Sequence, residues 1–92
     1  MRTSRVLTVE DDTALASVIR LSLRGLGFES LAASDGYEAL RVACRDHPDL
    51  IILDVAMPRL DGLETCRRIK QMTDIPVLMV SALTSEKDVI RG

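Results

Sequence analysis

The amino-acid sequence predicts an α/β fold, in which a parallel sheet carries helices on both of its faces. Short apolar runs alternate with segments of helical periodicity along the whole chain, as strand and helix repeated four times. The apolar runs are rich in Val, Ile and Leu, which is typical of parallel strands buried on both faces. The 92 residues are enough for one domain and too few for two.

Four apolar runs are the expected strands, namely residues 6–9, 28–33, 50–53 and 77–80. The first, third and fourth runs are almost continuously apolar, so we expect helices on both sides of them. The second run contains Glu29 and Ser30, which favours an edge position. No later run can pair with the outer side of the fourth, so the sheet is expected to lack a strand and to leave that edge open.

The first expected helix follows an acidic turn and ends at a pair of glycines. Its apolar face is predicted from helical spacing to contain Leu15, Val18, Ile19, Ser22, Leu23 and Leu26. Gly25 and Gly27 then favour termination. Asp12 precedes the helix, where a short acidic side chain can accept hydrogen bonds from the free backbone N–H groups.

The next two helices each begin with a pair of acids. Glu38 follows Asp35 by three residues and Glu64 follows Asp61 by three, a spacing typical of helix starts. Pro48 blocks continuation of the second helix. The residues expected on the buried faces are Leu40, Ala43 and Cys44 in the second helix and Leu63, Cys66 and Ile69 in the third.

Composition and charge exclude several classes of protein. Hydrophobic residues make up 47% and charged residues 28% of the chain, as in an ordinary folded domain. Twelve basic against 14 acidic residues, without a clustered basic face, argue against direct nucleic-acid binding. The apolar runs are too short to span a bilayer and no leader opens the chain, so we expect a cytoplasmic protein without membrane contact. Cys44 and Cys66 have no neighbour in a ligand spacing and are expected to be buried, reduced thiols.

Acidic and hydroxyl residues stand where the expected central strands end. Glu10, Asp11 and Asp12 follow the first strand, Asp54 follows the third and Ser81 the fourth. The carboxyl ends of parallel strands share one edge of the sheet, so Asp11 and Asp54 meet if the first and third strands are neighbours. Two carboxylates at such a short distance repel each other unless a cation lies between them. Mg²⁺ is a cation that binds carboxylate ligands.

Each of these residues also has a purely structural interpretation. Asp12 is interpreted as a helix cap, and taken singly Asp54 could be an ordinary loop acid and Ser81 a turn residue. Only their shared position at the ends of three strands favours a functional site. His47 lies at the opposite end of the strands from Ser81, so a nucleophile triad is not expected, and no glycine-rich phosphate loop opens a helix.

The three motifs together resemble the receiver domain of two-component response regulators. Residues 9–12 (VEDD) resemble its acidic turn, residues 53–62 (LDVAMPRLDG) its phosphoacceptor segment, and residues 80–82 (VSA) the end of its fourth strand. The resemblance covers nearly the whole chain. It implies a flavodoxin-like doubly wound parallel sheet. The expected strand order is 2-1-3-4, because the family's fifth strand and fifth helix are missing here. Residues 1–92 would then form one receiver domain that is incomplete at its C-terminus.

The resemblance also implies a role for each site residue. Asp54 would be the phosphoacceptor, and Ser81 would hydrogen-bond the phosphoryl group and act as a switch. Mg²⁺ would be held by Asp11, by Glu10 through water, by Asp54 and by the backbone carbonyl of Ala56. The protein would assist its own phosphorylation and dephosphorylation, with no turnover enzyme activity.

The resemblance finally implies partners. The phosphoryl donor would be a histidine kinase or a phosphotransfer protein, recognised through the exposed face of the first helix, where Ser17, Arg20 and Arg24 are candidates. A second copy of the chain is a further candidate partner, and an output domain would lie outside this chain. The alternative function is a phosphorylation-incompetent receiver that acts as a protein-binding or dimerisation module through the exposed edge of the fourth strand.

Overall fold

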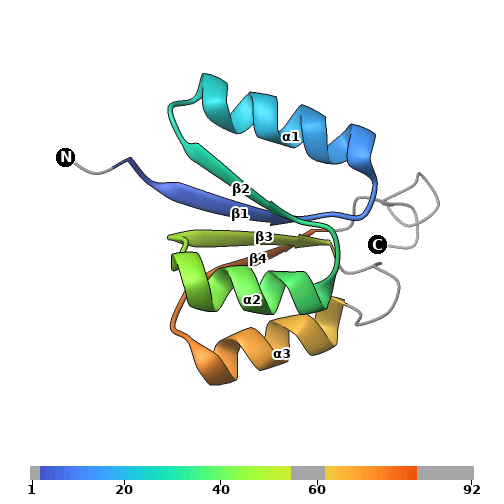
Figure 1. Ribbon diagram of the computed structural model, residues 1–92, viewed down its shortest axis with the longest axis vertical. Helices are drawn as coiled ribbons and strands as arrows, with labels where there is room; N and C mark the ends of the chain where they lie inside the picture. Colours follow the sequence, from blue (N-terminus) through green and yellow to red (C-terminus); the bar gives the residue numbers. More distant parts are fainter. Residues whose placement is uncertain (1–2, 55–61, 81–92) are drawn as a thin grey trace.

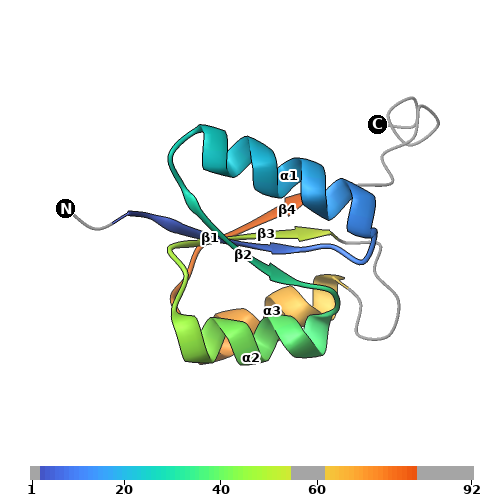
Figure 2. The ribbon, with the colours of Figure 1, turned by 45° about the horizontal axis from the view of Figure 1, so that its top comes forward.

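The computed structural model describes residues 3–54 and 62–80, which form a parallel sheet flanked by helices. The elements in chain order are β1 (Arg5–Val9), α1 (Thr13–Gly25), β2 (Glu29–Ala33), α2 (Gly36–Asp46), β3 (Leu50–Asp54), α3 (Gly62–Met72) and β4 (Val77–Val80). The strand order is β2-β1-β3-β4, and every pairing is parallel. One face of the sheet carries α1 and the other carries α2 and α3 (Figures 1 and 2). The predicted fold class and strand order are therefore confirmed.

The main core lies between the sheet and the helices α2 and α3. Leu7 of β1 is the register partner of Ile51 of β3, and both side chains are fully buried. Leu53 lies on the same face, and Val42 of α2 and Ile69 of α3 pack onto this row from the helices. Burying a side chain of this size stabilises the fold by roughly 1.5–3 kcal/mol. This layer accordingly anchors β3, the strand that ends at Asp54.

The helix α1 covers the opposite face more loosely, over β1 and β2. None of its residues is buried. Leu15, Ile19 and Leu23, spaced by four, are half-buried, whereas Val18 and Leu26 are 59% and 74% exposed. The prediction that Val18 and Leu26 lie on a buried face is therefore wrong. Each residue turns an α-helix by about 100°, and these two point to a side of α1 that the described strands do not reach.

Two further burial predictions are wrong for the same rotational reason. Leu63 is 69% exposed, because α3 turns Thr65 and Ile69 toward the core instead. Cys44 is exposed, since α2 turns the two preceding residues, Val42 and Ala43, toward the core. Cys66 is half-buried against the core. Periodicity thus placed Ala43 and Ile69 correctly on the buried faces of α2 and α3 but misassigned Leu63 and Cys44.

The strand β4 is the outermost strand on its side of the described sheet. Leu78 is 51% exposed, so the expectation that this strand is covered on both faces is wrong. The reason is the position of α1, which lies over β1 and β2, at the opposite edge of the sheet from β4 (Figure 1). Among the residues that the structure describes, no strand pairs with the outer edge of β4.

Side chains cap the helices that flank the carboxyl edge of the sheet. The Asp12 carboxylate accepts hydrogen bonds from the backbone N–H groups of Ala14 and Leu15, at 3.0 and 3.2 Å. Asp35 accepts from the Glu38 N–H at 2.9 Å and so starts α2. The helix α2 ends at Asp46, and the φ of +48° at the following cap residue, His47, lies in the left-handed region. The predicted cap roles of Asp12 and Asp35 are confirmed.

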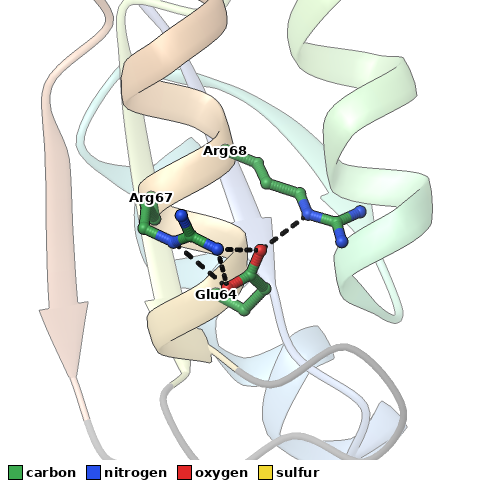
Figure 3. Close-up of polar contacts among 3 residues, drawn as sticks. All are labelled: Glu64, Arg67 and Arg68. Atoms are coloured by element: carbon green, nitrogen blue, oxygen red, sulfur yellow. Dashed lines mark hydrogen bonds and ion pairs between the residues drawn. The ribbon is translucent and has the colours of Figure 1, made fainter.

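The neighbouring basic residues Arg67 and Arg68 of α3 both pair with Glu64 of the same helix. Figure 3 shows Glu64 between Arg67 and Arg68. The shortest N–O distance is 2.6 Å from Glu64 to Arg67 and 2.8 Å from Glu64 to Arg68. Hydrogen bonds from the two guanidinium groups hold the pKa of Glu64 below its usual value.

None of the described helices has the length and apolar composition that crossing a membrane requires.

Candidate functional site

Three carboxylates meet at the carboxyl ends of β1 and β3. Val9 and Leu53 are partners in the parallel register, so the residues that follow them, Glu10 and Asp54, leave the two strands side by side. Asp11 joins them, and one carboxylate oxygen of each of the three residues lies within 4.8 Å of the other two. The structure thus brings Asp11 and Asp54 together, as the sequence predicts for neighbouring first and third strands.

The three acids differ sharply in burial. Asp54 is 2% exposed and Glu10 is 5% exposed, whereas Asp11 faces solvent. The backbone N–H of Glu10 donates to the Ala33 carbonyl at 3.0 Å, which holds the turn against the end of β2. The backbone N–H of Asp12 donates to Glu10 Oε2 at 3.1 Å. The cluster therefore has a rigid buried side and one open side, at Asp11.

The buried position of Glu10 changes its protonation. Burial, the main cause, and the nearby Asp54 carboxylate raise the pKa of Glu10 from 4.5 to about 7, against an opposing hydrogen bond from the Asp12 backbone N–H. Hydrogen bonds with Asp11 and Asp54 act in the same direction as burial. Near neutral pH, binding of either a proton or a cation stabilises the site, because both relieve the repulsion between carboxylates.

The donor set fits a hard divalent cation. Mg²⁺ binds oxygen ligands, commonly one or two carboxylates, and keeps several waters. The carboxylates of Glu10, Asp11 and Asp54 supply the oxygens, and the exposure of Asp11 leaves a side on which water ligands can remain. Ala56 and Ser81, the other predicted members of the site, lie outside the described residues.

The N-terminus of α1 lies directly after this cluster. The Asp12 carboxylate accepts hydrogen bonds from the first N–H groups of the helix, so the role of Asp12 is structural, as the sequence predicts. The free N–H groups at a helix N-terminus carry a partial positive charge, which favours negative groups nearby.

The sequence patterns placed Glu10 in this turn but did not predict its deep burial. The available signal was the position of Glu10 directly after a buried strand.

Comparisons with known proteins agree with this architecture. Residues 6–92 match the family model of the response regulator receiver domain. The response regulator MprA of Mycobacterium leprae is 44% identical over 89 residues, which cover 96% of this chain and 39% of MprA. The DNA-binding response regulator MtrA of Mycobacterium tuberculosis is 36% identical over 88 residues, which cover 96% of this chain and 39% of MtrA. The chemotaxis protein CheY4 of Vibrio cholerae superposes with a TM-score of 0.84 at 31% identity, over 99% of this chain and 78% of that chain.

The parallel sheet of order 2-1-3-4 with its three helices thus has the architecture of CheY-like receiver domains. The chain belongs to the response regulator receiver domain family. It spans less than two fifths of the length of the curated relatives described above.

The comparisons correct one prediction. The charge of the chain led to the expectation of no direct nucleic-acid binding, yet MtrA, a relative that matches almost all of this chain, is named a DNA-binding response regulator. The expectation failed because it rested on the charge of this chain alone. The chain covers only 39% of MtrA, so its surface carries no information about the other parts of such proteins.

Proposed function

We propose that this domain accepts a phosphoryl group on Asp54, from a histidine kinase or a phosphotransfer protein of a two-component system. The observation that carries the proposal is the acidic cluster, in which Asp54 lies buried with oxygens of Glu10 and Asp11 within 4.8 Å. Family membership supports the same assignment. In this proposal the domain is a cytoplasmic acceptor and does not turn over a separate substrate.

The chemistry is a nucleophilic displacement at phosphorus. A carboxylate oxygen of Asp54 attacks in line and forms a P–O bond, while the bond to the donor histidine nitrogen breaks and its electron pair leaves with the donor. Bound Mg²⁺ would offset negative charge on the transferred group. Glu10, Asp11 and the Ala56 carbonyl would hold the ion beside Asp54, and Ser81 would donate a hydrogen bond to the phosphoryl group.

The output of the domain is proposed from the relatives. MtrA is named as DNA-binding, and a phosphoryl group at a strand end can bias a two-state surface that an output domain reads. We therefore propose control of transcription as the output of a longer protein that contains this domain. Comparing operator binding of the full-length protein with and without phosphorylation tests this step.

The phosphoacceptor assignment is tested by intact mass after incubation with acetyl phosphate and Mg²⁺. We expect one phosphoryl adduct on the wild-type chain and none on Asp54→Asn. Asp74→Asn, which changes an exposed carboxylate outside the cluster, is the matched control and should keep the adduct. Circular dichroism confirms that all chains are folded. A folded wild-type chain without an adduct, or an Asp54→Asn chain with the same adduct, would refute the assignment.

A second candidate function is association through β4. The observation that favours it is the outer edge of β4, which no described strand covers, together with the half-exposed Leu78. It predicts concentration-dependent association in analytical ultracentrifugation, which Leu78→Lys should abolish because a charged side chain on an edge strand opposes pairing with another chain. A wild-type chain that stays monomeric at high concentration would exclude this function.

A further inference from the structure

A cavity of about 310 Å³ lies between α1 and the strands β1 and β2, on the face of the sheet opposite the main core. It exists because α1 buries none of its residues and presents small side chains, Ala16 and Ser17, to the sheet. On β2, Ala32 remains exposed beneath them. We propose that this cavity binds a small zwitterionic molecule, in which an ammonium group and a carboxylate are separated by a short apolar linker.

The charged groups of the cavity stand at its opposite ends. Glu38 lies at the carboxyl end of the strands, where its Oε1 accepts hydrogen bonds from the backbone N–H and hydroxyl of Ser34, at 2.8 and 3.0 Å. Its Oε2 makes no hydrogen bond with a described residue, and the Glu38 charge is felt at Arg45 of the same helix. Arg20 lies seven residues along α1 from Thr13, roughly 10 Å toward the other end at 1.5 Å per residue. Its guanidinium makes no hydrogen bond or ion pair with another described residue.

This separation determines the orientation of the ligand. An ammonium group is favoured next to Glu38, where Glu10 also lines the wall, and a carboxylate is repelled there. A carboxylate is favoured at Arg20, whose planar guanidinium donates in a geometry that suits it. A simple cation or anion satisfies only one end, so the cavity selects molecules that carry both charges.

The middle of the cavity suits an apolar linker with one polar contact. Alanine side chains from α1 and β2 form its walls. Thr8 also lines it, and the Thr8 hydroxyl is buried without a hydrogen-bond partner among the described residues. Buried hydroxyls in proteins nearly always have a partner, which a molecule in this cavity can supply. The volume is at the lower end of the range for ligand sites, which points to a small molecule rather than a large cofactor.

The test compares three probes by isothermal titration calorimetry on the 92-residue chain, with EDTA present to keep the acidic cluster free of metal. The probes are 6-aminohexanoate, hexylamine and hexanoate. We expect 6-aminohexanoate to bind at least ten-fold more tightly than either singly charged probe. Equal affinities for all three, or no binding of 6-aminohexanoate to the folded chain, would overturn the proposal.

Variants on α1 locate the binding. Ala16→Leu fills the cavity and should weaken 6-aminohexanoate binding at least ten-fold. Ala14→Leu adds the same volume at an exposed position that does not line the cavity, and should bind as the wild type does. Arg20→Gln should remove the preference for 6-aminohexanoate over hexylamine. Circular dichroism shows that each variant is folded, and unchanged binding by a folded Ala16→Leu chain would place the ligand elsewhere.

Discussion

Glu10 and Asp54 leave two adjacent parallel strands in register, and both acids are almost completely buried. Two carboxylates in this position cannot both carry a charge without a large cost in free energy, unless a cation or a proton compensates. The deep position follows from the packing of β1 and β3, since the strand residues before each acid are buried as well. The predicted responses of this domain to pH and to Mg²⁺ both rest on this pair.

Glu10 makes the stability of the metal-free domain depend on pH. Its pKa is about 7 in the folded state and 4.5 without burial, so the folded state binds more protons between these values. The contribution of Glu10 to the free energy of unfolding is greatest below pH 4.5 and is lost as the pH rises through 7. We expect the free energy of unfolding in EDTA to fall by up to about 3 kcal/mol between pH 5 and pH 8, measured by urea denaturation. Glu10→Gln should flatten this slope, and a slope that persists in the variant would assign it to another group.

Mg²⁺ should raise the melting temperature more at pH 8 than at pH 5.5. At the higher pH Glu10 is mostly ionised and the cluster binds a cation better, and a ligand that binds only the folded state stabilises it. Asp11→Asn should remove most of the shift, because it takes away the exposed ligand of the cluster. Asp74→Asn is the control for a lost surface charge and should keep the shift. Equal Mg²⁺ responses in Asp11→Asn and the wild type would contradict the proposed metal site.

Thr8→Val should stabilise the domain. The Thr8 hydroxyl is buried and has no partner among the described residues, so replacing it by a methyl group removes an unsatisfied polar atom. We expect the free energy of unfolding to rise by about 1 kcal/mol, measured by urea denaturation. Thr65→Val is the matched control, since Thr65 is equally buried but has a polar partner, and it should lower stability. A loss of stability in Thr8→Val would show that the hydroxyl is hydrogen-bonded in solution.

Asp12→Ala should lower the free energy of unfolding by about 1 kcal/mol. The change removes the carboxylate that accepts from the Ala14 and Leu15 N–H groups at the start of α1. Asp12→Asn keeps an accepting oxygen and should cost much less. Mg²⁺-dependent stabilisation should survive in both variants, because Asp12 is not part of the acidic cluster. A loss of the Mg²⁺ response in Asp12→Asn would instead make Asp12 a ligand.

Local patterns in the sequence predicted the elements and the place of the site. The period of the apolar residues identified every described strand and helix, and polar residues at the strand ends indicated the acidic cluster. The same patterns misplaced Val18, Leu63 and Cys44, which are exposed. Periodicity shows which side chains share a face of a helix, but which face is covered depends on where the helix lies on the sheet.

Local patterns were therefore sufficient to predict the order of strands and helices, the cap at Asp12 and the acids that follow two of the strands. These features depend on backbone propensities and on contacts between residues close in the chain. Three features come from the folded arrangement instead: the register that places Glu10 beside Asp54, the burial that raises the pKa of Glu10, and the cavity beneath α1. Each of these depends on the distance between segments far apart in sequence, which packing sets and no local pattern encodes.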